Sequence, residues 1–233
     1  MSPGRAPGTR PGGRHVFLIV LGCLLVALAL TTWKQGPRVV RQVWGRVGMR
    51  QVEGHAETIR LAAAESRIDP CLLAGLMYAE SRGQVDAVSN KGALGLFQLM
   101  ESSAGDAARR LKLPAPSKEQ LLNDPVLNTR LAASHLAWLI RHNGPDLERV
   151  LVAYNAGRGK LARWEEAAGG WQAWRAQRIA AGDSDALTYA QQVLEFAERF
   201  RAHGVIVAQA ERAPDAVEAA PRTAAKRARE RTR

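Results

Sequence analysis

Apolar residues recur every three or four positions in four segments of the chain, a spacing that places them on one face of an α-helix. Two of these segments open on Asp-Pro, at 69–70 and 124–125, where the aspartate can cap a helix and the proline can occupy its first turn. The other two begin near residues 147 and 185, and Gly157 can end the former. The four stripes are Leu73, Leu76, Met77 and Glu80; Leu127, Leu131, His135, Trp138 and Leu139; Leu147, Val150, Leu151 and Tyr154; and Tyr189, Val193, Phe196 and Phe200.

No segment alternates apolar and polar residues convincingly, as a half-buried strand would. We therefore predict an all-α domain over residues 53–202, which is long enough to bury one sizeable core. Before it lie a basic N-terminal segment at 1–15, an apolar segment at 16–33 and a basic juxtamembrane linker at 34–52. After it, residues 203–233 are rich in Ala, Arg, Glu and Pro, a composition that predicts a basic, disordered tail.

The apolar segment at 16–33 contains eighteen residues without a charge, and three interpretations of it compete. Its length is just enough for an uncleaved signal anchor that spans a bilayer, which is the interpretation that we favour. A cleavable signal peptide would use the small residues at 27–29 as its cleavage site. A lipoprotein signal would present Cys23, although seven further apolar residues follow it. Basic residues flank the segment on both sides, so charge does not determine its orientation.

The formal net charge of +11 raises the question of nucleic-acid binding. Residues 1–50 carry eight Arg or Lys and no acid, and residues 222–233 carry a further net charge of +5. The rest of the chain, 51–221, has a net charge of −2, whereas a nucleic-acid-binding domain carries its basic patch on the folded body. We therefore predict no nucleic-acid partner. The cysteines and histidines form no CxxC or HExxH pattern, so we also predict no disulfide, metal site or cofactor.

Glu80 ends the first stripe, and the glycine-containing segment SNKGALGLFQLM at 89–100 follows it closely. The simplest interpretation of Glu80 is a polar residue at a helix end. However, Gly92 and Gly95 allow a close approach of the backbone, so this loop can lie against Glu80 and offer Gln98 as a polar contact. Burial among Leu and Met side chains would raise the pKa of the carboxyl group. An acid of that kind is suited to protonating a glycosidic oxygen.

Four short motifs in this order resemble those of the soluble-type lytic transglycosylase catalytic domain, over roughly residues 65–202. Glu-Ser at 80–81 resembles the catalytic motif of this family, and GALGLFQLM at 92–100 resembles its glycine-rich substrate segment. AYNAG at 153–157 resembles its third motif, and Tyr189 in LTYAQQV its fourth. Five residues depart from the usual pattern of the family. Phe97 stands where Met is usual, Glu101 where Pro is usual and Ser103 where Thr is usual. Asp185 and Ala186 stand where Glu-Thr is common.

The resemblance implies a lysozyme-like α fold and cleavage of bacterial peptidoglycan. It implies that Glu80 is the single acid and base at the β-1,4 bond between N-acetylmuramic acid and N-acetylglucosamine, and that the product carries a 1,6-anhydromuramic end. Glu101 in place of proline is expected to loosen a turn and to add a charge near the substrate groove. The expected substrate-binding residues are Ser89, Gln98, Met100, Tyr154, Asn155 and Tyr189, of which Tyr189 is also expected to orient Glu80 or to pack against it.

The expected partners are peptidoglycan glycan strands and, through residues 16–33, the cytoplasmic membrane. Because the wall lies outside that membrane, we expect the catalytic domain in the cell envelope, either anchored or secreted. Two alternatives remain at this point: a lysozyme-like peptidoglycan hydrolase, and a wall-binding module without catalytic activity.

Overall fold

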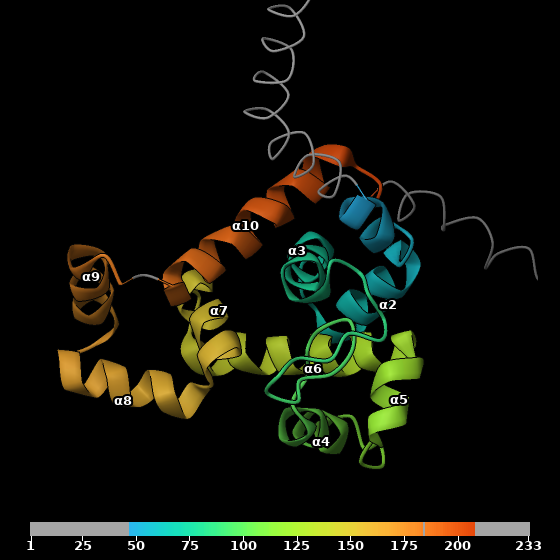
Figure 1. Cartoon of the computed structure of the whole chain (residues 1–233), viewed down its shortest axis with the longest axis horizontal. Coiled ribbons are helices and arrows are strands. Elements are labelled where there is room, and N and C mark those ends of the chain that lie inside the picture. Colours follow the sequence, from blue (N-terminus) through green and yellow to red (C-terminus); the bar gives the residue numbers. More distant parts are fainter. Residues whose placement is uncertain (1–46, 184, 208–233) are drawn as a thin grey trace, which may run out of the picture. The chain divides into compact units, whose positions relative to one another are not determined.

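The computed structural model describes residues 47–183 and 185–207, which form α-helices joined by loops (Figure 1). Residues 47–53 are helical, and the helices that follow are α2 Ala56–Ser66, α3 Pro70–Ser81, α4 Glu101–Arg110, α5 Lys118–Asn123, α6 Pro125–Asn143, α7 Leu147–Ala156, α8 Arg158–Ala168, α9 Trp171–Ala181 and α10 Asp185–His203. Within these ranges, strand-like pairing is limited to two isolated bridges, Val88–Leu94 and Leu94–Leu99. The prediction of an all-α domain is therefore confirmed.

The two Asp-Pro pairs begin helices as predicted. Asp69 Oδ1 accepts a hydrogen bond from the Cys71 backbone N–H at 2.8 Å, and Pro70 is the first residue of α3. Asp124 Oδ1 accepts in a similar way from the Leu127 N–H at 2.8 Å, at the start of α6. These bonds satisfy N–H groups that the start of a helix leaves without an intrahelical partner, and each typically contributes about 1 kcal/mol of stability.

Helix α3 lies between α2 and α10 and is buried over residues 71–78 (Figure 1). Gly75 permits the close approach of α10, because a Cβ atom at this position would lie 2.6 Å from the Val193 carbonyl oxygen and 2.7 Å from the Ala197 nitrogen. A larger residue would push the two helices apart. Helix α10 also packs on α7, so α10 contacts both α3 and α7.

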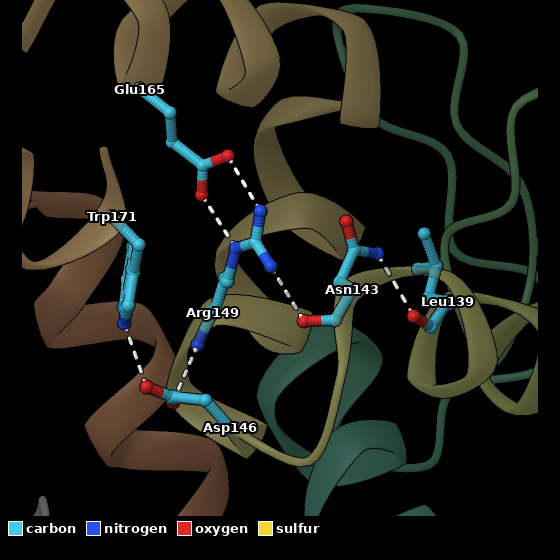
Figure 2. A network of polar contacts seen from close by, with 6 residues as sticks. All are labelled: Leu139, Asn143, Asp146, Arg149, Glu165 and Trp171. Atoms are coloured by element: carbon cyan, nitrogen blue, oxygen red, sulfur yellow. Dashed lines mark hydrogen bonds and ion pairs between the residues drawn. The ribbon is translucent and has the colours of Figure 1, made fainter. Parts of the chain in front are cut away.

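Helices α8 and α9 pack on each other, and α8 also packs on α7. Figure 2 shows the polar network that attaches this pair to the start of α7. Arg149 donates two hydrogen bonds to the Glu165 carboxylate, at 2.6 and 2.7 Å, and one to the Asn143 carbonyl oxygen, at 2.8 Å. Asp146 accepts from the Arg149 N–H at 3.1 Å and from the Trp171 indole N–H at 2.7 Å. A bidentate ion pair and a helix-capping carboxylate thus hold α7, α8 and α9 together.

The apolar segment at 16–33, the basic segment at 1–15, the first part of the linker and the tail beyond residue 207 lie outside the described residues. No helix in the described ranges is long and apolar enough to cross a membrane. Cys71, which lies in the described ranges, is buried and has a free thiol. Val52 and Ile206, near the two ends of the described chain, are fully buried and belong to the core.

Candidate active site

The packing of α10 on α3 brings Tyr189 to Glu80, the second-last residue of α3. The Tyr189 phenol donates a hydrogen bond to Glu80 Oε1 at 2.5 Å, across 109 positions of sequence. No Lys, Arg or His in the described ranges forms a salt bridge with Glu80. The carboxyl group is therefore held by a neutral donor and not by a cation.

Burial raises the pKa of the Glu80 carboxyl group to about 7, and the hydrogen bond from Tyr189 opposes part of this effect. Removal from water disfavours the charged form, and no ion pair compensates for the lost hydration. This agrees with the expectation from its place at the end of an apolar stripe. Near neutral pH, both protonation states are populated, so the group can donate a proton in one step and accept one in the next.

Two phenol groups lie within electrostatic reach of Glu80. Burial, and after it the Glu80 charge, raises the pKa of Tyr154 and of Tyr189 well above the usual value, so both stay neutral. The Tyr154 hydroxyl donates a hydrogen bond to the Phe97 carbonyl oxygen at 3.0 Å. Helix α7 thereby attaches to the glycine-containing loop beside the carboxyl group.

Ser81, which follows Glu80, attaches α3 to the loop at 82–100. Its Oγ donates to the Leu96 carbonyl oxygen at 2.8 Å and accepts from the Gly83 N–H at 3.1 Å. The side chain is buried, so these bonds form away from water, where their loss would be costly. Ser81 therefore positions the loop relative to Glu80.

Asn128 of α6 lies under the same loop and is 1% exposed. Its Oδ1 accepts from the Phe97 N–H at 3.2 Å, and its Nδ2 donates to the carbonyl oxygens of Leu94 and Leu121 at 3.2 and 2.9 Å. A Cβ atom at Gly95 would lie 2.3 Å from Asn128 Nδ2, and the φ angle of Gly95 is 75°. Both the space and the backbone conformation therefore require glycine here.

The side chains of Ser89 and Gln98 bond within the loop. Ser89 Oγ accepts from the backbone N–H groups of Lys91 and Ala93 at 3.2 and 3.0 Å. Gln98 has a positive φ of 47°, and its Nε2 donates to two loop carbonyl oxygens at 3.1 and 3.0 Å. These contacts leave the Ser89 O–H and the Gln98 Oε1 available to a ligand.

A cleft of about 840 Å³ is lined by the loop, by the end of α7 and by α8, α9 and the start of α10. Met100, which is 44% exposed, and the exposed Asn155 line it. Trp164 and Trp174, also in the lining, stack with their ring centroids 5.2 Å apart. Lys160 Nζ lies 4.8 Å from the Trp164 ring centroid. The cleft thus combines an aromatic wall with polar and cationic groups.

The predicted site residues fall into three groups in space. Glu80 and Tyr189 are in direct contact, with Tyr154 close enough for the Glu80 charge to act on its phenol. Met100 and Asn155 line the neighbouring cleft, which Glu80 itself does not line. Ser89 and Gln98 belong to the loop that Tyr154 contacts through Phe97. Tyr154 and Asn155 are consecutive in α7, so the end of this helix carries both a neighbour of Glu80 and a residue of the cleft lining.

Sequence analysis missed Asn128 and could not choose among the tryptophans. A signal for Asn128 did exist, since it precedes Leu131 by three positions and so lies on the apolar face of its helix, where an unpaired amide would be costly. Trp164 has no comparable signal, because its place in the cleft depends on how α8 packs against α7.

Glu101, which stands where the resembling family usually has proline, begins α4. Its carboxylate pairs with Lys118 at 3.1 Å, and both side chains are more than half exposed. An acidic residue in the first turn of a helix is favourable because of the helix dipole. Glu101 thus lies at a regular helix start, and the charge that it adds has a cationic partner.

The sequence of residues 57–176, just over half of the chain, matches the family described as Transglycosylase SLT domain. The chain belongs to this family. The resemblance to this family is thereby confirmed, and the all-α arrangement is the lysozyme-like fold of the transglycosylase SLT domain, as predicted.

A curated relative, the membrane-bound lytic murein transglycosylase C of Actinobacillus succinogenes, is 33% identical over 115 residues, which cover 45% of this chain and 32% of the relative. A solved structure, an inactive mutant of the lytic transglycosylase Slt from Pseudomonas aeruginosa, is 26% identical with a TM-score of 0.56, over 65% of this chain and 24% of that one. The 70 kDa soluble lytic transglycosylase of Escherichia coli is 24% identical with a TM-score of 0.55, over 63% and 24%. The chain thus spans about a third of the curated relative and about a quarter of each solved chain.

Proposed function

We propose that this protein is a peptidoglycan lytic transglycosylase in which Glu80 is the single acid and base. The observation that carries the proposal is a partly buried carboxyl group with a pKa of about 7, held by a phenol and without a salt bridge in the described ranges. Family membership and a relative named as a lytic murein transglycosylase support the same reaction class, that of a lyase acting on a polysaccharide.

The proposed reaction needs one group that first donates and then accepts a proton. Protonated Glu80 gives its proton to the oxygen between N-acetylmuramic acid and N-acetylglucosamine, while the N-acetyl group of the substrate assists bond cleavage. The Glu80 carboxylate then takes the proton of the muramic C6 hydroxyl, which closes a 1,6-anhydro ring without consuming water. Since this hydroxyl belongs to the same sugar, its effective concentration is high.

The substrate in this proposal is a glycan strand that lies in the cleft. Met100, Asn155 and Trp164, which line the cleft, contact it. Ser89 and Gln98 bind its N-acetyl region through the groups that the loop leaves available, while Tyr154 and Tyr189 hold Glu80 and the loop in place. Such a substrate places the domain in the cell envelope, anchored through residues 16–33 or secreted.

The test is digestion of purified sacculi followed by mass spectrometry of the released fragments. Fragments with 1,6-anhydromuramic ends support the proposal. Fragments with reducing muramic ends would instead indicate a lysozyme-like hydrolase. No fragments, with sacculi still bound, would indicate a wall-binding module without activity.

A hydrolase of the usual kind needs a second carboxylate, and Asp185 lines the cleft. The variant Asp185→Asn therefore serves as a matched control for Glu80→Gln. A single-carboxyl mechanism predicts that Asp185→Asn retains most of the activity, whereas Glu80→Gln loses it. Equal losses in the two variants would contradict that mechanism.

A further inference from the structure

Two arginines from different helices lie against Trp138, a partly buried residue of α6. The guanidinium carbons of Arg110, at the end of α4, and Arg158, at the start of α8, lie 5.0 and 5.3 Å from the centroid of its ring. The rings of His135 and His142 lie 6.0 and 4.6 Å from the same ring. We call Trp138, Arg110 and Arg158 the Trp138 cluster.

The positive charge of this cluster has no anionic partner in the described ranges. Neither Arg110 nor Arg158 forms a salt bridge there, and the buried Nε of Arg110 has no hydrogen-bond partner. Asp106, an acid whose charge acts on Arg110, pairs with Arg109 instead. Burial, with the Arg141 and Arg109 charges, lowers the pKa of Arg110 despite Asp106. Because no acid in the described part of the chain pairs with these arginines, the cluster would stabilise an anion that binds to it.

Two other arginines, one over an aromatic ring and one between helices, do have carboxylate partners. Arg199 lies over the Phe196 ring, with its guanidinium carbon 5.4 Å from the centroid, and pairs with Glu195 at 2.5 Å. Arg149, between helices, forms the bidentate pair with Glu165. Holding the partly buried guanidinium of Arg110 without a carboxylate partner costs free energy, so an anion from outside the chain would be stabilised beside Trp138.

The Trp138 cluster adjoins the candidate active site. The His135 ring lies between the two, with its centroid 6.0 Å from that of Trp138 and 5.5 Å from that of Tyr154. Burial and the Arg110 charge lower the pKa of His135 to about 4, so this ring is neutral and its Nδ1 accepts from Arg110 at 3.4 Å. An anion bound by the cluster would therefore lie near Tyr154, which directly precedes Asn155 of the cleft lining.

We propose that the Trp138 cluster binds carboxylate groups of the short peptides that branch from the muramic acid residues of peptidoglycan, so that the protein cleaves peptide-bearing strands in preference to bare ones. This inference rests on the proposed function. Guanidinium groups match a carboxylate with two parallel hydrogen bonds, and the Trp138 face offers apolar contact for the peptide stem. While the peptide is attached, the lactyl carboxyl of each muramic acid is an amide, so the glycan backbone itself offers this cluster no anion.

The test compares two substrates prepared from the same sacculi. One is intact; from the other an amidase has removed the peptides, and the lactyl carboxylates exposed in this way have been coupled to methylamine so that the stripped glycan carries no charge. The double variant Arg110→Gln/Arg158→Gln should lower kcat/KM on intact sacculi by about 10-fold or more, because it removes charge-assisted hydrogen bonds. On stripped glycan its kcat/KM should stay within about twofold of the unsubstituted value. Arg199→Gln, which removes a paired arginine from a ring, should change neither.

The exposed Arg158→Gln alone provides a second variant in case the double variant folds poorly, and it should show the same selective loss in smaller measure. Equal losses on the two substrates, or no loss on either, would overturn the inference. A second measurement tests the inference independently of the proposed reaction. Titration calorimetry measures how tightly the amidase-released peptides bind to the protein and to the double variant. Weaker binding of the peptides to the double variant supports the inference even if neither substrate is cleaved. The absence of cleavage would contradict the proposed function alone. Unchanged binding would overturn the inference.

Discussion

The two ends of α7 differ in the charge balance of their surroundings. At its start, Arg149 and Asp146 form the network of Figure 2, in which the guanidinium faces the Glu165 carboxylate and the capping acid faces an indole N–H. At its other end, Tyr154 lies near Glu80, whose carboxyl group has a phenol as partner and no salt bridge in the described part of the chain. One end is balanced in charge, and the other is not.

This difference distinguishes a structural network from the carboxyl group that we propose as the acid and base. Fully paired polar groups hold helices in place and keep fixed protonation states. A buried carboxyl group without a cation has its pKa moved toward neutrality, at a cost in stability whenever it is charged. The same helix thus carries a rigid attachment for α8 and α9 at one end and, at the other, a neighbour of the group that we propose transfers protons.

The largest expected effect comes from Glu80→Gln, which removes the titrating group and keeps its size and hydrogen-bonding ability. We expect the rate of sacculus digestion to fall by about 10³-fold or more, because both proton transfers need this group. Release of soluble fragments measures the loss, and circular dichroism checks that the fold is retained. Residual activity above about a tenth of the original would contradict the assigned role.

The same substitution should change how stability depends on pH. The folded-state pKa of Glu80 is about 7, above the ordinary value of 4.5, so the stabilisation due to protonation is complete below about pH 4.5 and is lost as the pH rises through 7. At pH 9, Glu80→Gln should therefore be more stable than the unsubstituted protein by up to about 3 kcal/mol, with no such gain near pH 4. Urea denaturation at both pH values measures the difference. A gain independent of pH would argue against a buried, titrating carboxyl group.

At the balanced end of α7, Arg149→Met should lower the free energy of unfolding by about 2 kcal/mol, because it leaves the Glu165 carboxylate without its partner at a partly buried site. Arg130→Met is the matched control, since Arg130 also forms a bidentate pair, with Glu65, but both side chains are more exposed. Its effect should stay below about 1 kcal/mol. Chemical denaturation of both variants checks the order, and equal effects would refute the proposed contrast.

The smallest effect is expected from Tyr189→Phe, which removes the hydrogen bond that lowers the pKa of Glu80. The pKa should rise by about one unit, since a hydrogen bond to a charged group contributes about 1.5 kcal/mol. Because the free enzyme must carry the protonated acid, the alkaline limb of kcat/KM should move to higher pH. A pH–rate profile measures this shift, and a lower rate with an unmoved limb would indicate a purely structural role for Tyr189.

Helix starts and the location of the carboxyl group could be predicted because their causes are local. Asp69 and Asp124 cap helices whose first residues directly follow them, and Glu80 lies seven positions after Leu73 on one helical face. Ser89 and Gln98 show the limit of such reasoning. Their type and their place in a motif indicated a ligand contact, but their side chains also bond within the loop, through geometry that no spacing encodes.

The sequence by itself determined the helical class, the family motifs and the acid at the end of α3, because these depend on residue types and on spacings of a few positions. The tertiary structure alone decided that Tyr189 bonds to Glu80 across 109 positions, that Asn128 supports the loop, and that α8 and α9 complete the cleft. It also decided that two arginines from separate helices meet at Trp138 without an acid. The physical reason is that burial and charge balance are properties of surroundings assembled from distant segments.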